Sequence, residues 1–268
     1  MNRNTSFLFL VLILLTANLN AQICYKDKAV VVIHNNELPL SEKKALVILP
    51  GLDENRNSRK HMQAFFDTTE YDLFIPDYID HNSFENSIAN FRFFAHEHQF
   101  EEYGELYFIS YILGTWVLNR YLEEAKPGNV AAMVYDRSPL QERAALVATE
   151  NIPFLARVFV GRVVEQLSER PYLTYSDTSV AKGIMIESRA TNLIRFFRKK
   201  TLALGPINWQ EPDLQQDHLD LMYVPLNHDQ MYDHYELIGA DILYFFKHHS
   251  FTSDARRTWY EWDPFTGK

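Results

Sequence analysis

Apolar runs rich in β-branched residues alternate along this chain with stretches whose apolar residues recur every three or four positions. Continuous apolar runs are typical of strands buried on both faces of a sheet. They cover Ala29–His34, Ala45–Gly51, Tyr71–Tyr78, Leu106–Ser110, Val130–Tyr135, Gly183–Ser188 and Leu221–Leu226. The helical spacing covers Ser58–Phe66, Ser83–Gln99, Leu113–Glu124, Ala190–Lys199 and Asp229–Lys247. This alternation predicts an α/β fold with a mostly parallel central sheet and helices on both faces.

One long insertion interrupts the alternation. Between the fifth and sixth expected strands, residues 138–172 carry apolar side chains at helical spacing. Ligands of open α/β sheets bind at the carboxyl ends of the strands, so we expect two or so helices that form a cap over this edge. Ordinary packing helices with no pocket beneath them are the alternative. No repeat or linker divides the chain, which favours one domain over 22–268.

The first residues have the pattern of a secretory signal peptide. Arg3 precedes an apolar run from Phe7 to Leu15, and a small, polar segment ends at Ala21. The run is shorter than the ~20 residues that span a bilayer. We therefore predict a signal peptide over 1–21, cleavage near Ala21 and an extracytoplasmic location, either periplasmic or secreted. An uncleaved anchor helix is the alternative.

Composition narrows the functional classes. The chain has 268 residues, of which 47% are hydrophobic and 14% aromatic, enough for a packed core. Its formal net charge is −9 and it has no long basic run, so nucleic acid is not an expected partner. The single cysteine, Cys24, allows no intramolecular disulfide. Neither phosphate-binding glycine motifs nor zinc-type histidine spacing occurs, so no cofactor or metal is expected.

Three segments resemble the α/β-hydrolase superfamily in order and spacing. They are "LVILPGL" (Leu46–Leu52), "SYILG" (Ser110–Gly114) and "VPLNHDQMY" (Val224–Tyr232). The resemblance covers most of the chain after the signal peptide. It implies that the loop at Gly51 and Leu52 supplies an oxyanion-hole amide, that a nucleophile elbow follows the fourth strand, and that His228 is the family's histidine.

The elbow departs from the family pattern at its most important position. The sharp turn requires small residues two positions either side of its apex. Ser110 and Gly114 satisfy this requirement only if Ile112 is the apex. Isoleucine has no nucleophilic atom, and a branched residue is strained at positive φ. We therefore expect an ordinary strand-to-helix connection at Ile112, with Tyr111 and Leu113 beside the pocket.

The resemblance also indicates where the acid lies. Glu187, at the end of the sixth expected strand, stands where the family places the carboxylate that orients His228, and Asp177 is the second choice. Asp136 and Arg137 end the fifth expected strand, at the ligand-binding edge. Arg143 follows close behind them. A buried charge needs a partner, so these charged residues either pair with one another, or an arginine faces an anionic ligand that they help to bind.

Two functions fit this sequence. The first is an exported pseudoenzyme that keeps the pocket, lacks the nucleophile, and binds a small-molecule or lipid-like ligand or a protein partner. The alternative is an active hydrolase of esterase, lipase or thioesterase type, which uses a displaced hydroxyl or a water activated by His228. The sequence specifies neither the ligand nor the oligomeric state.

Overall fold

A computed structural model describes residues 28–268, apart from positions 53, 170–173 and 211–216. The predicted signal peptide and Cys24 lie outside the described residues. Among the described residues, no helix combines the length and the apolar character that crossing a membrane requires.

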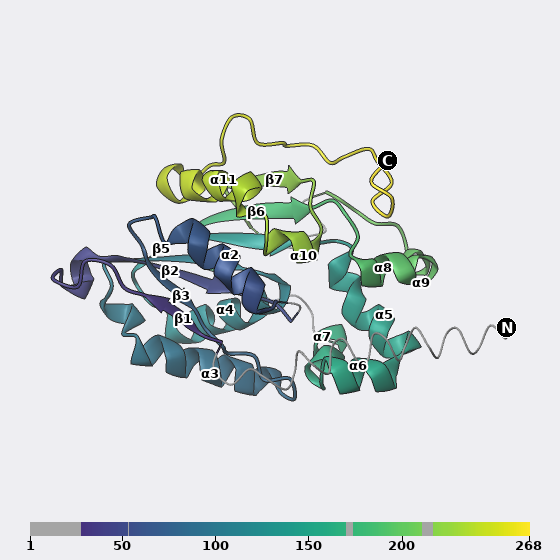
Figure 1. Ribbon diagram of the computed structural model, residues 1–268, viewed down its shortest axis with the longest axis horizontal. Helices are drawn as coiled ribbons and strands as arrows, with labels where there is room; N and C mark the ends of the chain where they lie inside the picture. The colour runs from purple at the N-terminus through teal and green to yellow at the C-terminus, as the bar shows by residue number, and fades with distance from the viewer. Residues whose placement is uncertain (1–27, 53, 170–173, 211–216) are drawn as a thin grey trace.

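Seven strands form one sheet in the order β1-β3-β2-β4-β5-β6-β7, with every neighbouring pair parallel except β1 and β3 (Figure 1). The strands are β1 (Val30–Val32), β2 (Lys44–Leu49), β3 (Asp72–Ile75), β4 (Glu105–Ser110), β5 (Val130–Arg137), β6 (Ala181–Glu187) and β7 (Asp220–Val224). The predicted α/β fold with a mostly parallel sheet is therefore confirmed. The first strand is less buried than expected: it pairs antiparallel at the sheet edge, and Val31 is 40% exposed.

Helices cover both faces of the sheet. The helices are α2 (Arg56–Phe66), α3 (Phe84–Glu97), α4 (Ile112–Ala125), α5 (Ala144–Asn151), α6 (Pro153–Phe159), α7 (Val163–Glu169), α8 (Asn192–Phe196), α9 (Arg198–Ala203), α10 (His228–Met231) and α11 (Tyr235–His248). Short 3₁₀ turns are η1 (Leu40–Glu42), η2 (Phe100–Glu102) and η3 (Gln141–Arg143). Two predicted helices are each divided in the structure, into α8 and α9 and into α10 and α11.

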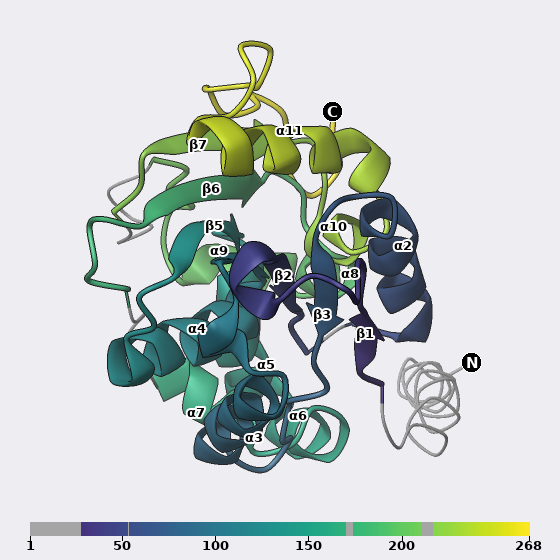
Figure 2. The same cartoon turned by 90° about the vertical axis from the view of Figure 1, so that its left-hand side faces the viewer.

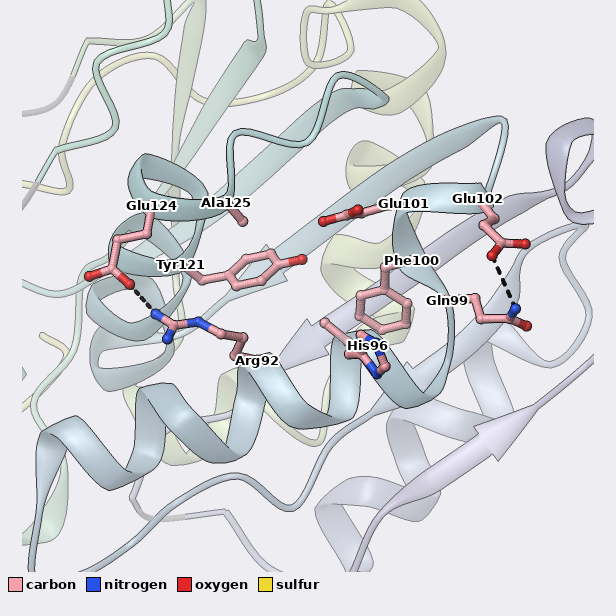
Figure 3. Close-up of a pocket in the computed structure, with 10 residues that line it drawn as sticks. Arg92, His96, Gln99, Phe100, Glu101, Glu102, Tyr121, Glu124 and Ala125 are labelled. Carbon is pink, nitrogen blue, oxygen red and sulfur yellow. Dashed lines mark hydrogen bonds and ion pairs between the residues drawn. The ribbon is translucent and has the colours of Figure 1, made fainter.

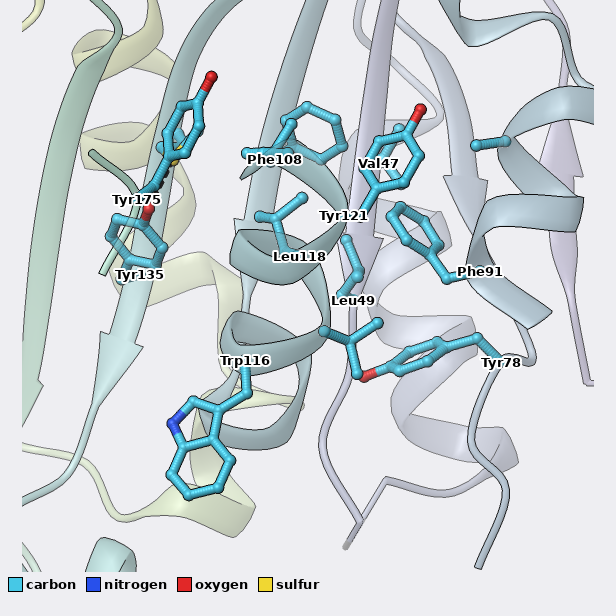
Figure 4. Close-up of a cluster of buried hydrophobic side chains, with 14 of the residues drawn as sticks. Val47, Leu49, Tyr78, Phe91, Phe108, Trp116, Leu118, Tyr121, Tyr135 and Tyr175 are labelled. Carbon is cyan, nitrogen blue, oxygen red and sulfur yellow. Dashed lines mark hydrogen bonds between the residues drawn. The ribbon is translucent and has the colours of Figure 1, made fainter. Parts of the chain in front are cut away.

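Alternating side chains of each strand enter two separate cores. Val47 and Leu49 of β2 pack toward α3 and α4 (Figure 4), whereas Leu46 and Ile48 pack toward α2 and α11. This alternation follows from the two-residue period of a strand. Both faces are apolar because helices cover both (Figure 2), which explains the continuous apolar runs in the sequence.

The insertion forms three α-helices, α5 to α7, beyond the carboxyl ends of the strands (Figure 1). Arg143, at its start, ties it to the end of α9 by donating hydrogen bonds to the backbone carbonyls of Thr201 and Gly205, at 3.0 and 2.8 Å. The predicted cap therefore lies at the predicted edge, with one more helix than expected.

The connection from β4 to α4 is held close to β2. A Cβ atom at Gly114 would lie 2.2 Å from the carbonyl oxygen of Leu49. Tyr111, between β4 and α4, donates its backbone N–H to the same oxygen at 3.1 Å. Only glycine at this position lets the first turn of α4 approach β2 so closely.

We predict that Gly114→Ala lowers the free energy of unfolding by about 1–3 kcal/mol, because α4 must move away from β2 to accommodate the added methyl group. Urea unfolding followed by tryptophan fluorescence measures the change. Gly128→Ala is the matched control, since no atom lies within 4 Å of its Cβ position. Equal effects of the two substitutions would contradict the close approach.

Candidate functional site

His228 is positioned at the carboxyl edge of the sheet, where α10 begins after β7. The side chain of Asn227 accepts a hydrogen bond from the backbone N–H of Gln230, and the Gln230 side chain accepts one from the backbone N–H of Asn227. This capping box satisfies two donors that a helix start otherwise leaves without partners. It fixes the start of α10 and so the direction of the His228 side chain, which is buried.

Two carboxylates from neighbouring strands reach the imidazole. Oε1 of Glu187, at the end of β6, lies 2.6 Å from Nδ1 of His228, and Oδ2 of Asp136, on β5, lies 3.2 Å from the same nitrogen. The structure thus brings together the histidine and the acid that the resemblance implied, and adds Asp136. Asp177, the second choice for the acid, lies elsewhere, in an exposed loop where it accepts hydrogen bonds from Ser179.

Burial and neighbouring charges shift the pKa values of Glu187 and His228. Burial raises the pKa of Glu187, and the charge of Asp136 raises it further, although His228 acts in the opposite direction. Burial alone would lower the pKa of His228, but the carboxylates of Glu187 and Asp136 outweigh it and raise this pKa well above its usual value. The environment therefore favours the protonated form of the imidazole beside these two acidic side chains.

The same three side chains could hold a metal ion. Among the described residues they are the one group of histidine and acidic side chains whose donor atoms converge, all within 4.8 Å of one another. A cation between them would replace the direct 2.6 Å contact between Glu187 and His228, which has the length of a charge-assisted hydrogen bond. The geometry favours the hydrogen bond, and the absence of a metal stays a prediction.

The other imidazole nitrogen, Nε2, faces a phenol. The hydroxyl oxygen of Tyr232 is 3.1 Å from Nε2 of His228 and accepts a hydrogen bond from the backbone N–H of Gly51 at 3.0 Å. A Cβ at residue 51 would lie 2.7 Å from this oxygen, so glycine is what permits the approach. Tyr232 therefore contacts both the histidine and the loop amide that the fold family uses for the nucleophile and the oxyanion.

Tyr111 packs its ring against the phenol ring of Tyr232. Its ring centroid lies 4.3 Å from that of Tyr232, and its hydroxyl contacts the Met231 carbonyl at 3.2 Å and bonds to the Tyr235 hydroxyl. The ring is fully buried. Tyr111 is not among the side chains that line the cavity, which corrects the prediction of a pocket role.

The elbow position has ordinary backbone geometry. Ile112 is the first residue of α4, and the described non-glycine residues with positive φ are Asn35, Gln99, Lys126 and His249. The expected plain strand-to-helix connection is therefore confirmed. Among the described residues, no serine, threonine or cysteine side chain hydrogen-bonds to His228.

The other hydroxyls near this edge have partners within the fold. Ser110 is buried, and its Oγ is 2.8 Å from the Thr115 hydroxyl. Ser138 caps the start of the cap segment, since its Oγ accepts a hydrogen bond from the backbone N–H of Gln141. None of these hydroxyls is poised for attack on a ligand in this arrangement.

A cavity of about 340 Å³ lies beneath the cap. Its lining from the sheet side includes four predicted pocket residues, Gly51, Leu52, Leu113 and His228, together with Ile112. The cap lines it mainly with apolar side chains, among them Leu146, Ala148, Val160, Val164 and Leu167. The cap thus covers a real pocket, and the ionisable His228 lies at its boundary.

Arg137 does not provide a free charge to this cavity. It is buried and donates to both carboxylate oxygens of Glu142, at 2.6 and 3.0 Å. The charged residues at this edge were expected to pair with one another or to leave an arginine facing an anionic ligand. Instead Asp136 faces His228, Arg137 pairs with Glu142, and Arg143 donates to backbone carbonyls. Glu54, in the loop after Gly51, likewise bonds to Arg59 and is buried.

A second hollow, of about 710 Å³, lies between α3, η2 and α4, away from this cluster (Figure 3). Two pairs of its polar side chains bond to each other: Arg92 bonds to Glu124, and Gln99 donates to Glu102. The cavity beneath the cap is the better candidate for a functional site, because it adjoins His228.

No protein-family model matches this chain, and no curated protein matches it in sequence. Solved structures do match. The type II thioesterase of the yersiniabactin NRPS/PKS biosynthetic pathway is 12% identical, over 84% of this chain and 100% of that chain, with a TM-score of 0.51. An epoxide hydrolase from metagenomes of hot environments is 11% identical, over 82% of this chain and 93% of that chain, with a TM-score of 0.50. The chain has the α/β-hydrolase fold, as the sequence resemblance implied.

The sequence alone does not single out Tyr232. The only signal was its spacing, because a residue four positions after His228 lies on the same side of a helix. Its contact with Gly51 joins residues 181 positions apart, and nothing in either local sequence indicates that meeting.

We predict that His228 is protonated at neutral pH and that Glu187→Gln lowers its pKa, because the substitution removes the strongest attraction on the imidazolium. Nitrogen-15 NMR of the imidazole across a pH titration measures both. Glu236→Gln is the matched control, because that exposed carboxylate bonds to His234 instead. A His228 pKa that Glu187→Gln leaves unchanged would contradict this electrostatic account.

The sign of the effect on stability follows from linkage. Since folding raises the pKa of His228, its contribution to stability is complete below the unfolded value of about 6.5 and is lost as pH rises through the folded value. The pKa of Glu187 is also raised by folding. The stability that this group contributes is therefore likewise lost as pH rises, from its unfolded pKa of about 4.3 upward.

Proposed function

We propose that this chain is an exported, non-hydrolytic protein with a hydrolase fold, a pseudoenzyme that binds a small apolar or lipid-like ligand beneath its cap. One observation carries the proposal: Nε2 of His228 meets the Tyr232 hydroxyl, while Ile112 begins the helix where a nucleophile would stand. An isoleucine side chain has no atom that can attack a carbonyl, and the loop amide of Gly51 is engaged by Tyr232.

The ligand class follows from the lining. A volume of about 340 Å³ lies within the range of small-molecule pockets, ~300–1,000 Å³. Leu113, Leu146 and Leu167 line it with other apolar side chains, so burial of apolar ligand surface is the main source of affinity. The polar lining residues include His228 and Arg143, which suit the carboxyl or ester end of a lipid-like molecule. The N-terminal signal-peptide pattern supports export.

A second candidate is an active hydrolase of esterase, lipase or thioesterase type. The observation that favours it is the retained hydrogen bond between His228 and Glu187, with the Tyr232 oxygen placed beneath the Gly51 amide. In this case His228 would accept a proton from Tyr232 or from a water that attacks the ester.

We predict that the chain from Gln22 hydrolyses nitrophenyl butyrate and nitrophenyl octanoate no faster than its His228→Ala variant does. Release of nitrophenol is followed by absorbance, with circular dichroism to show that both proteins are folded. Turnover that the substitution abolishes would support the hydrolase instead. Tyr232→Phe would then distinguish the phenol, whose loss stops turnover, from an activated water, which persists.

We predict that dodecanoic acid displaces a fluorescent fatty-acid probe from the folded chain, and that Leu146→Trp weakens its binding by about tenfold, or ~1.4 kcal/mol. The larger ring occupies space in the cavity that Leu146 lines. Leu237→Trp, on the exposed side of α11, is the matched control and keeps the affinity. Equal affinity of both variants would place the ligand elsewhere and contradict the proposed site.

A further inference from the structure

Exposed apolar side chains gather on helices at the cap end of the molecule. On α6, Phe154 is 76% and Val158 51% exposed, and a spacing of four residues places them on one face. On α8, Leu193 and Phe196 are three residues apart and are 41% and 61% exposed. Leu202, on α9, is also exposed.

These helices occupy the same end of the molecule, beyond the carboxyl ends of the strands, with α5 between α6 on one side and α8 and α9 on the other (Figure 1). Arg143 joins the cap to α9 through its bonds to Thr201 and Gly205. Val160, which follows α6, and Leu193 both line the cavity. The segments that carry these exposed apolar side chains therefore border the cavity beneath the cap on two sides.

The charge of the same segments is opposite to that of the whole chain. The formal net charge is −9, yet residues 188–210 contain five Lys and Arg residues and no Asp or Glu. Residues 152–164 add Arg157 and Arg162, again without an acid. The acidic side chains of the cap helices lie on α5 and α7, at Glu150, Glu165 and Glu169.

Several of these cations are available to a partner. Arg195, Lys199 and Lys200 are exposed, and no acidic side chain in the described part of the chain pairs with them. Arg198 pairs with Asp263 at 3.1 Å, so it contributes less. Phe196 lies between Arg195 and Arg198 in sequence and points to solvent. Exposed aromatic and aliphatic side chains beside lysine and arginine are the composition of helices that lie in a membrane interface.

We propose that the surface formed by α6, α8 and α9 docks on an anionic lipid bilayer. The cations are attracted to anionic headgroups, and Phe154, Phe196 and Leu202 enter the boundary between headgroups and acyl chains. Charge favours this occupant over a second copy of the chain, because two copies would bring like-charged surfaces together. The inference holds whether or not the cavity is catalytic, and it places the cavity lining at Leu193 next to lipid.

The test is flotation of the chain from Gln22 with two kinds of vesicle, phosphatidylcholine alone and phosphatidylcholine with phosphatidylglycerol in equal parts. This chain contains every described residue and omits the apolar run from Phe7 to Leu15, which would itself enter lipid. We expect binding to the anionic vesicles, weakened by salt, and much less binding to the neutral ones.

Two pairs of substitutions separate the charged and apolar contributions. Arg195→Glu with Lys199→Glu should lower the partition coefficient on anionic vesicles by roughly tenfold or more. Phe196→Ala with Leu202→Ala should lower it by a similar factor. Lys60→Glu with Lys247→Glu, on α2 and α11, is the matched charge control and Leu237→Ala the apolar control; both should bind nearly as the unaltered chain does.

Three results would overturn the proposal. They are absence of binding to anionic vesicles, equal binding to both kinds of vesicle, and equal effects of the control and surface substitutions. Self-association that the Phe196→Ala and Leu202→Ala pair disrupts, without lipid binding, would show that a second copy covers this surface instead.

Discussion

Burial of one imidazole between two carboxylates is the constraint around which the candidate site is arranged. His228, Glu187 and Asp136 are each at most 3% exposed, and charges in such an environment are costly unless they are paired. The imidazolium offsets one carboxylate, and the raised pKa of Glu187 reduces the cost of placing a second acid beside the first. The ends of β5 and β6 and the capping box of α10 bring these three side chains together.

The phenol of Tyr232 extends this cluster toward the loop after β2. In a hydrolase the histidine and the loop amide act on a nucleophile and on an oxyanion, whereas here a single side chain engages both. Removal of a nucleophile from such a site would leave two buried donors, the Gly51 N–H and the Nε2–H of the imidazolium, without partners, which is energetically unfavourable. Tyr232 satisfies them, so the fold retains its charged cluster with Ile112 at the helix start.

The cap helices contribute side chains both to the cavity and to the outer surface. Their inner side lines the cavity with apolar residues, and their outer side, with α8 and α9, presents exposed apolar and basic residues. Exposed apolar area of this kind usually marks an interaction site. A ligand-binding cavity and a lipid-facing surface on the same helices would place an apolar ligand close to the membrane that supplies it.

The sequence by itself determined the architecture, because strand and helix periodicity depends only on neighbouring residues. Through the resemblance it also indicated the contact between His228 and Glu187, and the small residues Ser110 and Gly114 predicted an ordinary connection at Ile112. Two assignments required the tertiary structure. Asp136 faces His228 because β5 and β6 are adjacent in the sheet, and Tyr232 meets Gly51 because the end of α10 lies beside the loop after β2. Such contacts join segments that are far apart in the sequence, so the local pattern of residues does not predict them.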